Sequence, residues 1–121
     1  MHAAEKAMKS WIERECALDG VLAGGGGLGA TSGFSAFASG EMVLAGNDEA
    51  WRIIGGNLAH LADTGAPVEE LLWGFEHAVL CTVQRADGVW LGVFTVPKLP
   101  DESALALREK LDDFKQQNFA S

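Results

Sequence analysis

The sequence from Ala78 to Val96 reads AVLCTVQRADGVWLGVFTV and contains the strongest fold signal in the chain. Two apolar runs of strand length flank Ala86-Asp87-Gly88, a turn composition typical of a β-hairpin. Apolar residues occupy successive positions in both runs, so both faces of each strand are expected to be buried. The stretch therefore predicts two adjacent strands in a sheet that helices cover on both sides.

Three segments with apolar residues at three- and four-residue steps are expected to supply those helices. The first ends at Asp19-Gly20, where glycine suits the left-handed position that follows a helix. Asn47 is a good N-cap for the second helix, and Asp101 for the third. The expected helices span residues 3–18, 47–64 and 102–117, and the first forms an N-terminal segment 1–19 together with its stop.

Five strands are expected between these helices. Three of them are residues 70–75, 78–84 and 89–96, and a hairpin of residues 34–38 and 42–45 precedes the middle helix. With 121 residues, the chain is expected to form a single domain, 1–121. The order helix-β-β-helix-β-β-β-helix predicts an α+β fold. We expect a three-layer α/β/α sandwich, in which one five-stranded antiparallel sheet lies between the middle helix and the two terminal helices.

An uncharged window from Gly20 to Gly40 contains eight glycines. Within it, residues 24–33 are expected to form a glycine-rich loop, because glycine loses much conformational entropy in regular structure. Gly24, Gly26 and Gly29 match the GxGxxG spacing of phosphate-binding loops. However, Ala30 stands at the Walker lysine position, and no helix is expected to follow. A nucleotide- or phosphate-binding protein using Gly24–Gly29 is therefore kept as an alternative, and a structural loop is preferred.

The formal net charge of −8 argues against nucleic acid and anionic membranes as partners, because both attract clustered Lys and Arg. The uncharged window has too many glycine and hydroxyl residues for a transmembrane helix, so a cytoplasmic location without membrane insertion is expected. No catalytic triad, metal-ligand cluster or cofactor motif is visible in the sequence. His77 is expected in a solvated turn and Cys81 in the core. We therefore predict no enzymatic activity, no metal and no cofactor.

An interaction surface is predicted instead. Leu72 and Trp73 belong to the first of the three C-terminal strands, a candidate sheet edge that would invite pairing unless a loop or terminal helix covers it. Two glycines on the small face of the middle helix each cost about 1 kcal/mol against alanine, which indicates close approach by another backbone. The predicted surface consists of Gly55, Gly56, Ala59, His60, Leu72 and Trp73.

In element order, and in the hairpin quoted above, the segments Phe34–Ala45, Asn47–Ala62 and Leu71–Val96 resemble the Roadblock family. This is the dynein light-chain roadblock type, with bacterial and archaeal members, and the resemblance covers about the last 90 residues. It implies a non-enzymatic domain that dimerises through the middle helix and the neighbouring edge strand. It also implies a role as a platform for small Ras-like GTPases or for motor and signalling complexes. The dimer surface implied in this way consists of Gly56, Ala59, His60, Leu72 and Trp73.

The order of helices and hairpin is also similar to that of profilin. Ser10-Trp11 in the first helix, and aromatic residues near the C-terminus such as Phe119, resemble the profilin site for proline-rich peptides. This resemblance implies a peptide-binding module as a further alternative. Only three strands are expected between the last two helices, and the chain contains no tyrosine. Both observations favour the Roadblock resemblance.

Overall fold

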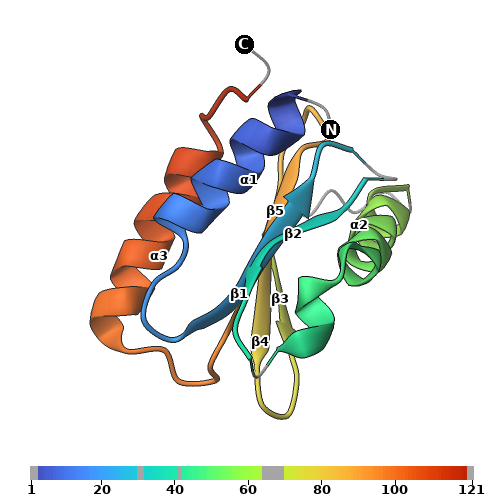
Figure 1. Ribbon diagram of the computed structural model, residues 1–121. Coiled ribbons are helices and arrows are strands. Elements are labelled where there is room, and N and C mark those ends of the chain that lie inside the picture. The colour runs from blue at the N-terminus through green and yellow to red at the C-terminus, as the bar shows by residue number, and fades with distance from the viewer. Residues whose placement is uncertain (1–2, 30–31, 41, 64–69, 120–121) are drawn as a thin grey trace.

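The computed structural model describes residues 3–29, 32–40, 42–63 and 70–119 (Figure 1). In these ranges the chain forms three α-helices, five strands and a short 3-10 helix, η1. The elements are α1 (Ala3–Glu15), β1 (Val21–Gly27), β2 (Phe34–Ala38), η1 (Val43–Gly46), α2 (Asp48–Asp63), β3 (Glu70–Gly74), β4 (Val79–Gln84), β5 (Trp90–Thr95) and α3 (Asp101–Phe114). The predicted α+β class and the order of helices and strands are confirmed.

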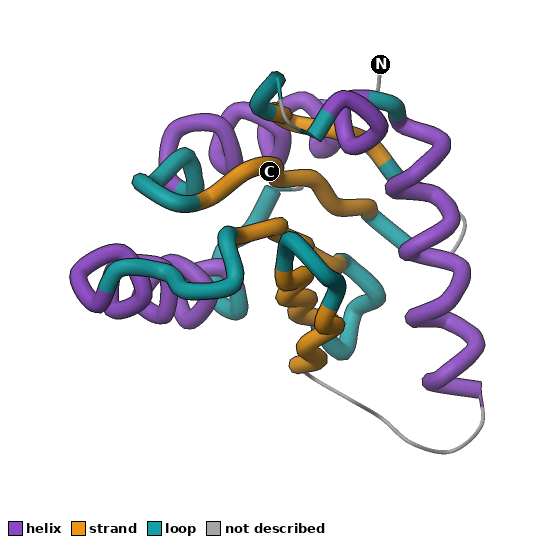
Figure 2. The backbone as a smooth tube through the Cα atoms, turned by 90° about the horizontal axis from the view of Figure 1, so that it is seen from below, coloured by secondary structure: helices purple, strands orange, loops and turns teal. Residues whose placement is uncertain are grey.

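The five strands form one antiparallel sheet in the order β2-β1-β5-β4-β3. Helix α2 lies against one face of this sheet, and α1 and α3 lie side by side against the other (Figure 1). Seen from below in Figure 2, the strands lie between α2 and the other two helices. β2 and β3 are the two edge strands, and the hairpin β4–β5 lies inside the sheet as its apolar faces predicted.

Each face of the sheet has its own hydrophobic core. On the α1 and α3 side, Met8, Ile12 and Phe114 are fully buried against β4 and β5 residues. On the α2 side, Trp51 and Leu58 pack against Trp90 of β5. A sheet covered on both faces requires strands that are apolar on both faces, which is the pattern that the β4 and β5 sequences carry.

The expected loop at residues 24–33 is wrong for its first part, because Gly24–Gly27 form the second half of β1. β1 pairs with β2 on one side and with β5 on the other. A Cβ atom added at Gly25 would lie 2.5 Å from Cδ2 of Trp51, and one added at Gly26 would lie 2.6 Å from Cε of Met8. Side chains from both helix layers therefore fill the space where β1 side chains would stand, and this packing outweighs the poor strand propensity of glycine.

The expected strand at residues 42–45 is also wrong, and η1 occupies this position. The amide of Met42 donates to the carbonyl of Ser39, and the amide of Ala45 donates to the carbonyl of Met42. These local three-residue bonds give a tightly wound turn instead of a strand. β2 pairs with β1 instead.

The turn and cap predictions hold with one exception. Gly20 and Gly88 have φ angles of 88° and 90°, a left-handed region that favours glycine. The side chain of Asn47 accepts a hydrogen bond from the amide of Glu49 at 3.0 Å, as expected of an N-cap. The exception is Asp101, which is the first residue of α3, while Pro100 occupies the cap position. The predicted end of the middle helix at Thr64-Gly65 lies outside the described residues.

Candidate interaction surface

β3 forms an edge of the sheet and hydrogen-bonds within the described chain to β4 alone. Its side chains alternate between the two faces. Leu71 and Trp73 pack against the core on the α2 side, while Glu70 pairs with Arg108 of α3 on the other side. An edge strand presents unpaired backbone N–H and C=O groups, which makes it a template for pairing with another chain.

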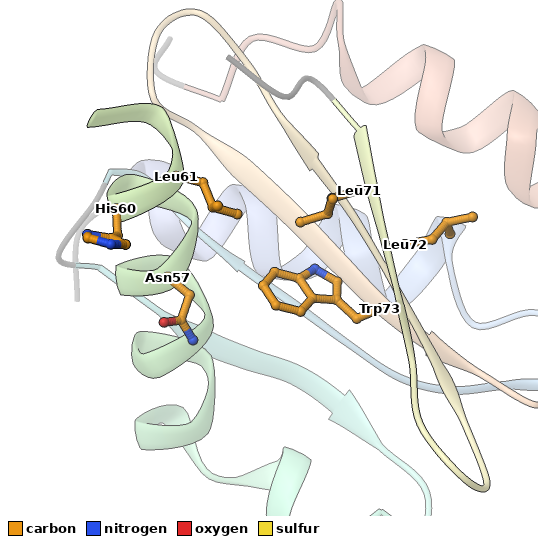
Figure 3. A pocket seen from close by; sticks show the side chains of 6 residues that line it. All are labelled: Asn57, His60, Leu61, Leu71, Leu72 and Trp73. Carbon is orange, nitrogen blue, oxygen red and sulfur yellow. The ribbon is translucent and has the colours of Figure 1, made fainter. Parts of the chain in front are cut away.

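A groove of about 350 Å³ separates β3 from α2. Figure 3 shows Leu71 and the indole of Trp73 directed from β3 toward α2, and Leu72 directed to the opposite side of the strand. The groove between α2 and β3 is lined by Asn57, His60, Leu61, Leu71, Leu72 and Trp73. We call this the α2–β3 groove. None of its lining residues is Asp, Glu, Lys or Arg, so it is an almost uncharged surface on an acidic chain.

The indole nitrogen of Trp73 is buried beside this groove without a hydrogen-bond acceptor among the described residues. Leaving a buried donor unpaired costs about 1–3 kcal/mol, because the group has lost its water and gained no replacement. Buried Trp N–H groups usually find a partner. The indole nitrogen of Trp90 in the core is in the same state, so this feature alone does not mark a contact site.

Five of the six predicted surface residues are exposed or half-buried, and four of them, all but Ala59, lie at this groove or next to it. Leu72, Trp73 and His60 line it. Gly56 is exposed, and a Cβ atom placed there would meet nothing within 4 Å. Ala59 is half-buried on the same helix. α2 thus offers a small-residue position with open space above it, beside the edge strand.

Gly55 is the exception, and its assignment to the free helix face is wrong. Gly55 is buried, and a Cβ atom there would lie 3.0 Å from the carbonyl oxygen of Ser32 and 3.0 Å from Cζ2 of Trp90. The residue allows α2 to approach its own sheet, not another molecule. A helical wheel placed both glycines on one side, but consecutive residues differ by about 100° in direction and these two point to different environments.

The predicted surface did not include Leu71 of β3, and it also missed two lining residues of α2, Asn57 and Leu61. They lie three residues before and one residue after His60, so together with it they occupy one side of α2. The signal was available in that spacing. Leu61 is half-buried and borders the groove.

Large apolar side chains are exposed around the edge strand. Leu72 is 72% exposed, Ile53 on α2 is 59% exposed, and Phe75 directly after β3 is 55% exposed. Phe75 keeps one ring contact, with Phe94 at 6.2 Å between centroids. Leu72 points away from α2, whereas Ile53 lies on α2, so these residues do not form one continuous apolar patch.

The described part of the chain contains no metal-binding cluster, and burial raises the pKa of both of its thiols. No group of three or more His, Cys, Asp or Glu residues is placed to hold a metal ion there. Burial raises the pKa of the Cys16 thiol to about 12, and it also raises the pKa of Cys81. Both thiols are free and stay protonated near neutral pH, the opposite of an activated nucleophile. His77 is exposed beside Glu76.

The two alternative sites fit the structure poorly. The amides of Gly24–Gly27 belong to a strand paired on both sides, and a helix N-terminus does not follow them, so a phosphate cradle is not formed there. Trp11 is only 6% exposed, and its ring packs against Phe114 and Phe119. A peptide would have to displace these contacts to reach it.

No protein-family model and no curated protein matches this chain. None of the helices in the described ranges combines the length and apolar character that a bilayer crossing requires.

Proposed function

We propose that the protein is a non-enzymatic, cytoplasmic interaction platform that forms a homodimer through α2 and β3. As a dimer it binds or regulates a small Ras-like GTPase, or a signalling or motor complex. The observation that carries the proposal is the edge strand β3 beside the almost uncharged α2–β3 groove.

The edge strand supports a partner that supplies a strand. Two β3 strands related by a twofold axis would pair antiparallel and join two five-stranded sheets, with the same residues on both sides of the contact. This arrangement satisfies the backbone groups along β3 and places the second α2 over the groove. The open space above Gly56 leaves room for that helix.

The charge distribution supports a second copy as the partner. At a twofold contact, each charged residue near the axis meets its own copy, so like charges accumulate. The chain has a net charge of −8, and the α2–β3 groove has no acidic or basic side chain apart from His60. Self-association at this groove therefore brings no like-charged lining side chains together, and Glu70 of β3 is already paired with Arg108.

The GTPase, signalling or motor partner rests on the resemblance to the Roadblock family. It is compatible with the separated thiols and exposed histidine described above, which offer no assembled catalytic group. A homodimer of this kind contributes a surface, and the chemistry belongs to the bound protein.

Sedimentation equilibrium tests the dimer. At tens of micromolar, the protein is expected to sediment at twice its 12.8 kDa chain mass. Gly56→Arg places a long charged side chain where the second helix would pack, and it is expected to raise the dimer dissociation constant at least about tenfold. The matched control is Ala7→Arg, which adds the same side chain to an exposed position of α1 on the opposite face. A monomeric wild type, or equal dissociation constants for the two variants, would contradict the proposed dimer.

The partner is tested separately. Small Ras-like GTPases of the source organism, loaded with GDP or with a non-hydrolysable GTP analogue, are titrated onto the immobilised dimer. Binding of one nucleotide state with unchanged hydrolysis indicates a platform, and faster hydrolysis indicates a regulator. Absence of binding in both states refutes the GTPase part and leaves the dimer to be judged by sedimentation.

A further inference from the structure

A second groove lies on the other side of the edge strand, between β3 and α3. Its volume is about 420 Å³, and it is lined by Glu70, Leu71, Leu72, Cys81 and Arg108. The sheet separates it from α2, because Glu70 is on the α3 side of β3. Leu72 is shared with the predicted interaction surface, and the other lining residues of this groove lie outside that prediction.

Ion pairs link α3 to β3, and they involve the two basic side chains beside this groove, Arg108 and Lys115. Nη1 of Arg108 donates to Oε1 of Glu70 at 2.6 Å, and Nη2 donates to Oδ1 of Asp112 at 2.9 Å. Lys115 donates to the other oxygen of Glu70 at 3.2 Å. The positive charges at the groove are therefore already paired with carboxylates of the same chain.

Leu72 lines this groove, and Leu105 precedes the lining residue Arg108 by one turn of α3. Leu72 is 72% exposed and Leu105 is 66% exposed, the highest values among the exposed large apolar residues of the described chain. Leu105 precedes Arg108 by three residues, so the two lie on neighbouring positions of one helix flank. Burying either leucine under a partner would remove a large apolar side chain from water, which favours association.

The strand register places Leu72 near the N-terminal half of α3, which contains Leu105. At the end of β4, Arg85 donates to the carbonyls of Phe114 and Gln117, at the C-terminal end of α3. Leu72 pairs with Cys81, four residues before Arg85, and therefore lies away from that end. We call the surface formed by Leu72, Cys81, Arg108 and Leu105 the Leu72–Leu105 groove.

The exposed flank of α3 around Leu105 is acidic. Asp101, Glu102 and Glu109 lie four residues before, three residues before and four residues after Leu105, and all three are exposed. α3 as a whole has five carboxylates and two basic side chains. Apolar anchors on this flank are therefore surrounded by negative charge.

We propose that the Leu72–Leu105 groove binds a basic amphipathic helix of a partner protein. The apolar stripe of such a helix would cover Leu72, Leu105 and Cys81, and its Lys and Arg side chains would meet Glu102 and Glu109. An anionic membrane is disfavoured as the occupant, because the same carboxylates repel it. The proposal does not depend on the dimer, since the groove is formed by one chain.

The probe is a fluorescein-labelled peptide of leucine and lysine, about 18 residues long so that it can hold a helix. Leucines at i, i+3, i+4 and i+7 give it one apolar stripe. A second peptide has the same composition with the leucines spread around the helix. Fluorescence anisotropy is measured at low salt and at physiological salt. The striped peptide is expected to bind at least tenfold more tightly at physiological salt.

Single substitutions locate the binding site. Leu72→Ser and Leu105→Ser are each expected to weaken binding of the striped peptide about tenfold, the effect of losing one buried leucine contact. Ile53→Ser is the matched control, because Ile53 is 59% exposed on α2 at the other face, and it should leave binding unchanged. Glu109→Gln should weaken binding at low salt more than at physiological salt.

Other outcomes overturn the proposal. Equal affinity for the two peptides would mean that the protein recognises only their net charge and not an apolar stripe. Loss of binding in Ile53→Ser, with none in Leu105→Ser, would place the peptide on the α2 face. Co-sedimentation with anionic vesicles, abolished by Leu105→Ser, would identify a lipid surface as the occupant. Sedimentation equilibrium of Leu105→Ser distinguishes this proposal from the dimer. Leu105 lies outside α2 and β3, so the variant should still form the dimer while losing peptide binding.

Discussion

Trp51 on α2 and Trp90 on β5 pack against each other with ring centroids 6.2 Å apart, and glycines occupy the sheet positions facing them. A Cβ atom at Gly25 would meet Cδ2 of Trp51, and one at Gly92 would lie 2.9 Å from Cζ3 of the same ring. The glycines of β1 and β5 thus make room for two indoles between the sheet and α2. The uncharged glycine run is explained by packing.

Gly25→Ala is expected to destabilise the protein by about 3 kcal/mol or more, because the added methyl group meets both the Trp51 ring and the backbone carbonyl of Phe34. Urea unfolding followed by tryptophan fluorescence measures the loss. The matched control is Gly74→Ala, another strand glycine, where a Cβ atom would meet nothing within 4 Å. Similar losses in the two variants would refute this account of the glycine run.

Two adjacent glycines of α2 are expected to respond in opposite directions to the same change. Gly56→Ala should raise the free energy of unfolding by about 1 kcal/mol, the difference in helix propensity, because the position is open. Gly55→Ala gains the same propensity but pushes a methyl group against Trp90 and Ser32, so it should lower stability. Thermal unfolding at one protein concentration compares them. A gain in both variants would show that α2 is not packed as closely as described.

Arg85 is expected to anchor the C-terminal end of α3. Nη1 donates to the carbonyl of Phe114 at 3.1 Å and to that of Gln117 at 2.5 Å, and the guanidinium lies 5.3 Å from the Phe114 ring centre. Arg85→Met keeps an apolar stem but removes the donors, at an expected cost of about 1.5–3 kcal/mol. Arg14→Met serves as the control, since its side chain is 65% exposed, and its loss should be within about 0.5 kcal/mol. Hydrogen exchange at residues 111–117 should accelerate in Arg85→Met alone.

Glu70 links stability to acid pH. Its hydrogen bond from Arg108, with a further one from Lys115, lowers the pKa of Glu70 below its ordinary value of 4.5. A carboxyl whose pKa is lower in the folded state stabilises the fold above the unfolded-state pKa, and this contribution is lost as the pH falls through the folded-state pKa. Glu70→Gln is therefore expected to flatten the fall in stability below about pH 4.5.

The control for the pH experiment is Glu102→Gln, an exposed carboxyl at the start of the same helix. Chemical unfolding measured from pH 7 down to pH 3 gives both curves. An acid limb in Glu70→Gln as steep as in wild type would show that the ion pairs between β3 and α3 do not form in solution.

Much of the fold was predictable because its signals are local. The β4–β5 hairpin follows from two apolar runs and a glycine with a positive φ angle at Gly88, and the start of α2 follows from the Asn47 cap. The edge position of Trp73 was also predicted. These features depend on residues a few positions apart, whose preferences act in the same way in most surroundings.

The failed predictions concern positions where distant residues decide. The strand at Gly24–Gly27 contradicts glycine propensity, because Trp51 and Met8 fill both faces of β1 and only a residue without Cβ fits between them. The different environments of Gly55 and Gly56 depend on Trp90, 35 and 34 residues further along the chain. Neither neighbour is visible in a helical wheel or a propensity scale.

The sequence by itself determined the α+β class, the order of helices and strands, and the lack of an obvious catalytic motif, since periodicity and caps are properties of short segments. Only the tertiary structure decided which surfaces exist. The α2–β3 groove is formed by residues of α2 and an edge strand. The Leu72–Leu105 groove depends on the contact of Glu70 with Arg108, 38 residues away. A surface is made by segments that folding brings together, and the long-range packing that does so is not encoded at any single position.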